Sequence, residues 1–561
     1  MKSIIILSSL SLLASSFLYG VDLPNIGDAM RQAQPPKEME KPKSDIPIIQ
    51  GSDQVTPSQS LEGGKKVLVK RFFITGAERM NNDELKAIVA PYENKELSFK
   101  EMEDIATLIT NAYRKKGYFI ARAFVPKQNI FTQDDRLKIE VVEGKYGKFH
   151  LKNSSLVSNE RVQGIFDDIK NRDIVSNESL ERAMLIANDT PGLKVTKASA
   201  REGKEVETSD FDIVTETTNP YGASIITDNY GSKYTGRYKI NASVSANSPL
   251  GYGDKFGMNV LVSTAMDLKN GKVFYSVPLM DNGLRGEISA SKTTYSLAED
   301  YKALDALGNS NALEVSLSYP IVKTKQETLD VSFGYAHKKM KDEVRSVYDL
   351  TRKEADVANL NLAYMKNDTL FGFNSTTTSS LTMTRGNIDF EDANKLTADI
   401  GGANTHGDYT KLGGSVEQSL EFNKEYSLTT IFKFQKALGN KNLDGSEDFS
   451  LGGAYGVRAF PDGEHSAENG YLLGTEFFYT LPTYEGIKHK VSIFADTGYA
   501  KMENPTGASE GKQLSDMGLG YQASYKEFFA KAQLARVIGG QKSETEDKES
   551  TRFLLQAGWT Y

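Results

Sequence analysis

Arg458 is the residue that most clearly indicates a functional site, because of its side-chain type and its neighbours in the sequence. It lies in the stretch from Leu451 to Glu476, LGGAYGVRAFPDGEHSAENGYLLGTE, among small and aromatic residues and between two segments that read as strands. A guanidinium can hold a carboxylate through two parallel hydrogen bonds, a geometry that lysine lacks. Asp462 and Glu464 are local candidates for that carboxylate. Paired with either of them, Arg458 would form an exposed ion pair worth at most about 1 kcal/mol.

Asp496 is a more distant candidate, because its segment alternates like a strand. From Val491 to Tyr499 every second side chain shares a face, which groups Phe494, Asp496 and Gly498 opposite an apolar set. If the apolar face meets lipid, Asp496 faces a lumen, where it needs water or a cationic partner. We therefore predict that Arg458 pairs with Asp496.

Catalytic or cofactor chemistry finds no support elsewhere in the chain. The five histidines lie far apart without an HExxH spacing, and neither GxSxG nor GxxxxGK(S/T) occurs. With no cysteine there is no thiolate nucleophile, cysteine metal site or disulfide. Gly518 to Ala523 matches a dinucleotide fingerprint formally, but it sits among predicted strands with no following helix. We therefore expect neither an enzyme nor a cofactor.

The amino-terminal residues and the composition bear on location. Residues 1–20, with Lys2 before an apolar run from Ile4 to Leu18, read as a secretory signal peptide. No later apolar run approaches eighteen residues, which argues against membrane helices. Barrel strands need only about ten residues with every second one apolar, so a membrane barrel stays open. A formal net charge of −7 argues against nucleic-acid binding.

Residues 21–34 and 35–64 read as a short helix-compatible piece and a polar linker. The run from Asp28 to Gln34, which includes Met30 and Arg31, ends at Pro35-Pro36. The segment after it is rich in Pro, Ser, Lys and Glu and cannot bury enough apolar surface to fold by itself. Composition alone leaves open whether residues 21–34 form a helix or a tail.

Two α+β repeats are predicted, in residues 65–145 and 146–217. In the first, a strand from Lys66 to Ile74 precedes two helices, the second of which begins with a capping box of Ser98 and Glu101, and then strands over 118–125 and 136–142. The second repeats this order weakly. Such a domain leaves a sheet edge accessible, which suits capture of an extended polypeptide, although a rigid spacer would show the same pattern.

Short alternating strands fill residues 218–561. Leu313, Val315 and Leu317, for example, alternate with polar residues. A soluble sandwich could share this pattern, but the signal peptide and the aromatic strand ends favour a membrane β-barrel. At about 20 residues per strand and turn there is room for about sixteen antiparallel strands. Trp559 and Tyr561 end the chain on the apolar register of the last strand.

Two short motifs resemble those of a known family. V457-R458-A459-F460 and F494-A-D496-T-G498 resemble the paired VRG(Y/F) and FxDxG motifs of two-partner-secretion outer-membrane transporters, the TpsB family. Ala459 departs from the usual glycine. The stretches KKGYFIARAFVPKQNI and LKIEVVEG resemble a POTRA (polypeptide-transport-associated) domain. The motif residues are Val457, Arg458, Ala459, Phe460, Phe494, Asp496 and Gly498.

The resemblance implies a sixteen-stranded outer-membrane barrel, two periplasmic POTRA domains, and a plug helix that carries Asp28, Met30 and Arg31. It also implies that the loop bearing Arg458 folds back into the lumen, and that barrel assembly machinery reads Trp559 and Tyr561. In this family the POTRA domains recognise an unfolded exoprotein and the barrel passes it to the cell surface. The implied partners are thus a β-helical adhesin or haemolysin and the outer-membrane lipids.

Two alternative functions stay open at this point. An outer-membrane assembly insertase of the same superfamily would usually carry more than two POTRA domains. A passive porin would conduct solutes but would bind no exoprotein. The plug-like helix and the two predicted POTRA domains favour the secretion pore.

Overall fold

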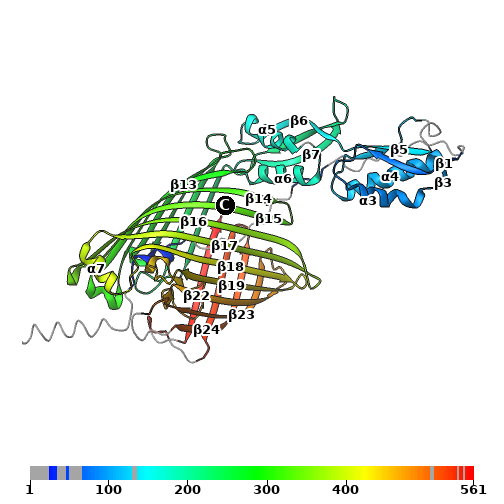
Figure 1. The fold of residues 1–561 in the computed structure, drawn as a ribbon. Helices are drawn as coiled ribbons and strands as arrows, with labels where there is room; N and C mark the ends of the chain where they lie inside the picture. Colours follow the sequence, from blue (N-terminus) through cyan, green and yellow to red (C-terminus); the bar gives the residue numbers. More distant parts are fainter. Residues whose placement is uncertain are drawn as a thin grey trace, which may run out of the picture.

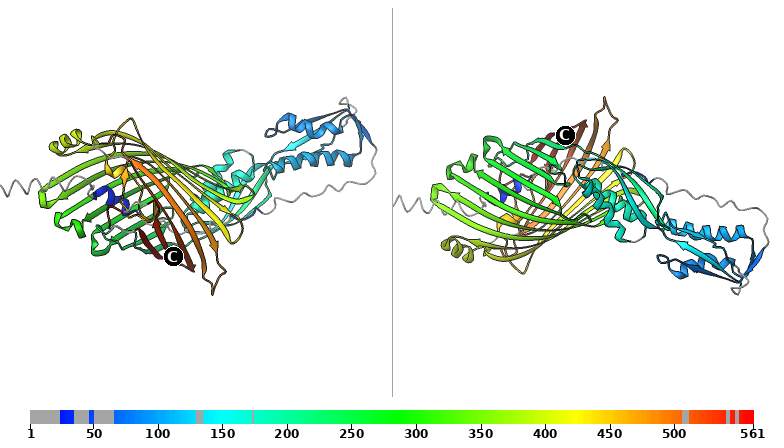
Figure 2. Two further views of the ribbon diagram at one scale, coloured as in Figure 1. Left: turned by 90° about the horizontal axis from the view of Figure 1, so that it is seen from below. Right: turned by 90° about the horizontal axis from the view of Figure 1, so that it is seen from above.

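The computed structural model describes residues 24–34, 46–49, 66–128, 135–172, 174–505, 511–539, 543–546 and 550–561. The predicted signal peptide, residues 21–23 and most of the predicted linker lie outside these ranges. The described chain forms a barrel with an elongated α+β arm at one end (Figures 1 and 2). Within those ranges no helix combines the length and apolarity needed to cross a membrane.

The outer unit of the arm packs two helices against a small sheet. The strand order is β2-β5-β4, and β1 and β3 form a separate pair. The predicted capping box is present: Ser98 N donates to Glu101 Oε2 at 2.6 Å, and Glu101 N donates to Ser98 Oγ at 3.3 Å, which satisfies two free donors at the helix start. The elements are β1 (Val67–Val69), β2 (Arg71–Thr75), α3 (Asn82–Val89), η1 (Ala90–Tyr92), β3 (Lys95–Leu97), α4 (Phe99–Lys115), β4 (Arg122–Phe124) and β5 (Arg136–Val142).

Two strands predicted in this unit are wrong in extent. The strand predicted from Lys66 to Ile74 is broken at Lys70, whose N–H donates to Asp135 O at 2.8 Å, so that β1 and β2 join different sheets. The strand predicted over 118–125 shortens to β4, because Ala121 N donates to Tyr118 O at 3.1 Å and closes a turn.

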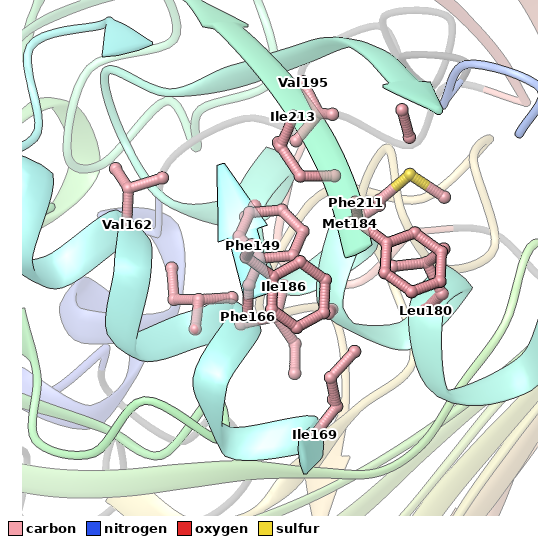
Figure 3. Packing of buried hydrophobic residues seen from close by; sticks show 14 of the residues in the cluster. Phe149, Val162, Phe166, Ile169, Leu180, Met184, Ile186, Val195, Phe211 and Ile213 are labelled. Carbon is pink, nitrogen blue, oxygen red and sulfur yellow. The ribbon is translucent and has the colours of Figure 1, made fainter. Parts of the chain in front are cut away.

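The inner unit of the arm repeats the order strand, helix, helix, strand, strand. Its sheet has the order β6-β8-β7. Its core is aromatic: Phe149 stacks on Phe211 with ring centroids 5.4 Å apart, and Phe166 packs beside them (Figure 3). The elements are β6 (Lys145–Ser154), α5 (Asn159–Asp168), η3 (Ile169–Arg172), α6 (Asn177–Asp189), β7 (Lys194–Glu202) and β8 (Thr208–Glu216).

The inner unit is held against the turns at the near end of the barrel. Arg161 Nη2 donates to Pro278 O at 2.7 Å, and Arg182 Nη2 donates to Pro320 O at 2.6 Å. Lys323 also forms an ion pair with Asp189. Because charged donors meet backbone carbonyls near the ends of β12 and β14, this unit has a defined position relative to the barrel.

Sixteen antiparallel strands close into the barrel, as predicted. Each pairs with the next in the chain, and β26 closes the barrel against β9. They are β9 (Tyr221–Asp228), β10 (Lys239–Asn247), β11 (Lys255–Ser263), β12 (Leu268–Pro278), β13 (Arg285–Ser296), β14 (Ala306–Lys323), β15 (Glu327–Val344), β16 (Asp349–Leu370), β17 (Phe373–Phe390), β18 (Gly407–Glu421), β19 (Tyr426–Leu438), β22 (Asn469–Thr480), β23 (Lys488–Lys501), β24 (Lys512–Tyr525), β25 (Phe528–Val537) and β26 (Thr551–Thr560).

Apolar side chains cover the outside of the barrel. Three of them on β14, Leu313, Val315 and Leu317, are 52%, 47% and 42% exposed, as expected of a row of side chains that faces lipid. On the last strand Phe553 and Tyr561 also point outward, and the ring of Trp559 stacks on that of Tyr561 at 6.1 Å. The end remote from the arm carries helix α7 (Ala393–Gly401), beyond the long strands β14 to β17 (Figure 1).

Candidate functional site: the lumen loop and the plug helix

The connection between β19 and β22, residues 439–468, returns into the lumen. It starts at the end remote from the arm and contains η7 (Gly445–Glu447), β20 (Phe449–Ser450) and β21 (Ser466–Ala467). Leu451, Val457 and Phe460 are fully buried in it. They pack with Phe494 and other lumen-facing residues of β22 to β25. We call this segment the lumen loop.

Arg458 lies at the tip of the lumen loop, beside two carboxylates on the barrel wall. Its Nε donates to Asp496 Oδ2 at 2.7 Å and its Nη2 to Asp496 Oδ1 at 3.0 Å, a two-point contact. Its Nη1 donates to Glu476 Oε2 at 2.7 Å. The guanidinium carbon lies 3.5 Å from the ring centre of Phe494. Arg458 is thus held by three charge-assisted hydrogen bonds and an aromatic face.

The alternation of β23 places Asp496 on the lumen side, as predicted. It is 5% exposed, whereas Ile493, on the opposite face, is 59% exposed. Directly across the ladder lies Gly474, where an added Cβ would come within 2.7 Å of Asp496 Oδ1. Gly498 clears space in the same way for Leu451 of the loop, which would lie 2.8 Å from a Cβ. Both glycines therefore make room for the docked loop.

A third carboxylate, Asp516 on β24, holds the loop backbone. Asp516 lies across the ladder from Asp496 and is fully buried. It accepts a hydrogen bond from Ala459 N. The φ angle of Ala459 is not positive, so alanine fits where the resembling motif has glycine. The backbone oxygen of the next residue, Phe460, accepts a hydrogen bond from Arg552 Nη1 at 2.6 Å.

Glu464 fastens the loop at a second point and does not pair with Arg458. Its carboxylate accepts from Lys512 Nζ at 2.9 Å, Ser543 Oγ at 2.7 Å and Glu544 N at 2.9 Å. Burial by itself would raise the pKa of Glu464, but these hydrogen bonds outweigh it and lower the pKa below its ordinary value. The local alternative, an exposed pair of Arg458 with Asp462 or Glu464, is wrong.

A short helix, α2 (Ile26–Gln32), lies inside the barrel beside the lumen loop (blue in Figure 2). Its first helical residue, Ile26, lies two residues before the predicted run from Asp28, because Asn25 is the N-cap and forms a capping box with Asp28. Ile26 and Ala29 are buried against the wall. The helix is therefore present, but it is shorter than residues 21–34.

The contacts of α2 with the barrel and the lumen loop are mostly hydrogen bonds between one charged side chain and a neutral backbone group. Ile26 N donates to Asp342 Oδ1 at 2.9 Å, and Lys239 Nζ donates to Gln32 O at 3.2 Å. Arg31 donates to Gly445 O in the lumen loop, and its ion pair with Asp28 is internal to the helix. Met30 is half-buried against the same apolar cluster. Of the three predicted plug residues, Arg31 thus links α2 to the loop.

Sequence reasoning missed Glu476, Asp516 and Gly474. All three share the lumen face of their strands, so alternation alone could have placed them there. Their convergence on Arg458 depends on how β22, β23 and β24 align, which the sequence pattern does not specify. Across the part of the chain that the structure describes, no cluster of three or more His, Cys, Asp or Glu residues could hold a metal ion.

Comparison with known proteins agrees with this architecture. The family described as haemolysin secretion/activation protein ShlB/FhaC/HecB matches residues 207–523, and the ShlB-type POTRA domain matches residues 67–144. Heme/hemopexin transporter protein HuxB of Haemophilus influenzae is 25% identical over 529 residues, covering 92% of this chain and 91% of that protein. Hemolysin transporter protein HpmB of Proteus mirabilis is 19% identical over 589 residues and covers 100% of both chains.

Solved structures show the same fold. CdiB from Escherichia coli superposes with a TM-score of 0.73 at 17% identity, covering 100% of this chain and 98% of that one. BamA from Haemophilus ducreyi lacking POTRA domains 1–3 gives a TM-score of 0.51 at 14% identity, covering 89% of this chain. With a family model matching more than half of its residues, this chain belongs to the ShlB/FhaC/HecB haemolysin secretion/activation family, the TpsB transporters.

Proposed function

We propose a route for the exoprotein through this transporter: capture on the outer POTRA unit, entry past the inner unit, and passage along a lumen from which α2 has left while the lumen loop stays docked. Transporters of this family translocate exoproteins across the outer membrane, with their POTRA domains in the periplasm. The observation that carries the route is the unequal attachment of the two segments inside the barrel.

Buried ion pairs join the lumen loop to the barrel wall, whereas among the described residues no ion pair joins α2 to the wall. Arg458 and Asp496 are 8% and 5% exposed, and removing one partner of such a pair costs about 3–5 kcal/mol, because the other charge is left uncompensated. The hydrogen bonds of α2 to Asp342, Lys239 and Gly445 contribute about 1.5–3 kcal/mol each, and none of them leaves a buried ion pair broken when the helix departs. A helix of seven residues has little stability of its own once it leaves these contacts. The helix is thus the segment that an arriving polypeptide displaces.

Capture is supported by an open sheet edge in the outer unit. Strand β2 pairs with β5 on one side, and among the described strands nothing pairs with its other side. Phe73 on β2 and Phe124 on β4 are 56% and 36% exposed. The pairing of both strands with β5 puts these rings on the outer face of the sheet. An extended polypeptide can add to such an edge and place apolar side chains beside the rings.

The exoprotein is first identified as the secreted protein that disappears from the medium when this transporter is deleted. Removing residues 67–144 should stop its secretion and leave the barrel inserted, and the Phe73→Ser, Phe124→Ser double variant should reduce it strongly. Phe99→Ser is the matched control, because Phe99 is 53% exposed but lies on α4. Rescue of the deletion by an unrelated domain of similar size would show that the unit is only a spacer.

The finer identity of the partner follows from the family. We propose a large β-helical adhesin or haemolysin that reaches the periplasm unfolded, with its folding outside the cell supplying the driving force. Barrel assembly machinery would read Trp559 and Tyr561. Secretion assays with Trp559→Ala and Tyr561→Ala, scored for barrel insertion first, separate an assembly defect from a transport defect.

A further inference from the structure

Along one line on the outer surface of β12 and β13, the side chains change from apolar to basic toward the ends of these strands that are remote from the arm. On β12 the outward side chains run Val273, Gly271, Lys269. On β13 they run Ile288, Ala290, Lys292. The arm is periplasmic, so this line lies at the outer-leaflet surface of the membrane, where lipid headgroups begin.

A groove of about 470 Å³ crosses this line. Met258, Val273 and Leu313 form its apolar part, and Lys292, His337 and Lys339 its polar part. The hollow arises because two outward positions are small: Ala290 lies across from Val273, and Gly271 lies across from Lys292. A Cβ added at Gly271 would meet no atom within 4 Å.

Two lysines, Lys292 in the lining of the groove and Lys269 beside it, have side chains without a protein partner among the described residues. Lys339 forms an ion pair with Glu354 at 2.6 Å, and His337 contacts Asp356 at 2.9 Å. The side chains of Lys269 and Lys292, in contrast, form no ion pair or hydrogen bond with any residue that the structure describes, although both backbones pair within the sheet. They flank Gly271, since Lys292 is directly across from it and Lys269 is two residues along on the same face. This places two free positive charges above an apolar hollow, in a chain whose net charge is −7.

We propose that this groove binds a phosphorylated lipid of the outer leaflet. Its acyl chain lies on Met258, Val273 and Leu313, and its phosphate lies between Lys269 and Lys292. The occupant is a lipid because the apolar end of the groove continues into the lipid-facing rows of Val315 and Phe333, which are 47% and 49% exposed. Its headgroup is anionic because the two ammonium groups at the opposite end have no carboxylate partner.

The test uses the full-length protein in detergent and native mass spectrometry, with lipid A bearing two phosphates as the probe and phosphatidylethanolamine as the zwitterionic comparison. Wild type should retain the phosphorylated lipid preferentially. Lys269→Gln with Lys292→Gln should weaken its retention about 25-fold, at about fivefold for each lysine near a membrane surface. Lys501→Gln is the matched control, because Lys501 is an exposed lysine at the same end of the barrel on β23.

Gly271→Leu tests the hollow separately from the charge. It should weaken retention of the lipid although both lysines are kept, and the heat-modifiable migration of the barrel should be unchanged. Equal retention by wild type and the lysine double variant would overturn the proposal, as would equal binding of phosphatidylethanolamine. A dimer in the native spectrum that Gly271→Leu abolishes would overturn it too, because the groove would then be a contact between two copies.

Discussion

Substitution of Arg458 or Asp496 should undock the lumen loop and abolish secretion while the barrel still inserts. Asp496→Ala removes two of the three hydrogen bonds of Arg458, at 2.7 and 3.0 Å, and leaves the one to Glu476. Arg458→Ala removes all three and leaves Asp496 and Glu476 facing each other without a cation. We therefore expect Arg458→Ala to be at least as severe as Asp496→Ala.

The size of the expected effect follows from the burial of the Arg458–Asp496 pair. One partner lost from a buried pair costs about 3–5 kcal/mol, whereas moving a loop from 99% docked to 99% undocked takes about 5.5 kcal/mol. A loss of about 3–5 kcal/mol should thus leave the loop of each single variant more than half undocked, and the released loop then obstructs the lumen. Arg458→Lys should be substantially impaired, because an ammonium cannot make the planar two-point contact with Asp496 and also reach Glu476.

The double variant Arg458→Ala, Asp496→Ala provides the decisive comparison. If the two residues act as a pair, it should be no worse than Arg458→Ala, since the second substitution removes a charge that the first left unpaired. Secretion, single-channel noise and the temperature of heat-modified migration are measured for all four variants. Arg385→Ala is the control, because Arg385 and Asp408 form a pair at 3.4 Å with side chains 72% and 67% exposed, worth about 0–1 kcal/mol. Additive losses, or an Asp496→Ala variant that secretes normally, would refute the pairing.

Three further predictions concern the plug, the arm and pH. Deleting residues 21–34 should raise single-channel conductance and leave migration heat-modifiable; unchanged conductance would mean that α2 does not occlude the pore. The variants Thr190→Cys and Gly253→Cys should form a disulfide, since a Cβ at Gly253 would lie 3.8 Å from that of Thr190 and the chain has no other cysteine. This disulfide should leave secretion intact if the inner unit of the arm stays fixed, and loss of secretion that a reductant restores would show that the unit must move. Because the pKa of Glu464 is lowered in the docked loop, its anchoring is complete above the ordinary value of 4.5 and is lost as the pH falls through the lower pKa. Conductance noise should therefore rise only below pH 4.5, and Glu464→Gln should remove that dependence.

Local patterns in the sequence were enough for much of the fold. The alternation of apolar and polar side chains along β23 predicted which face meets lipid and which meets the lumen. It thereby predicted the orientation of Asp496, because neighbouring side chains in a strand point to opposite faces. Ser98 and Glu101 predicted the start of α4, because a capping box involves only residues three apart. The number of barrel strands followed from chain length and the usual span of a strand and its turn.

Tertiary structure decided which lumen-facing groups meet. Strand register, set by closure of the barrel, brings Glu476 to the same guanidinium as Asp496 and matches Gly474 to that site. It also places Asp516 across from Asp496, where it holds the backbone of the next loop residue, Ala459. The same holds for Glu464, which finds Lys512 instead of its neighbour Arg458. Side-chain alternation is a property of one strand, whereas register and loop placement are fixed by contacts between residues far apart in the chain, so the sequence pattern determined the faces and only the closed barrel determined the partners.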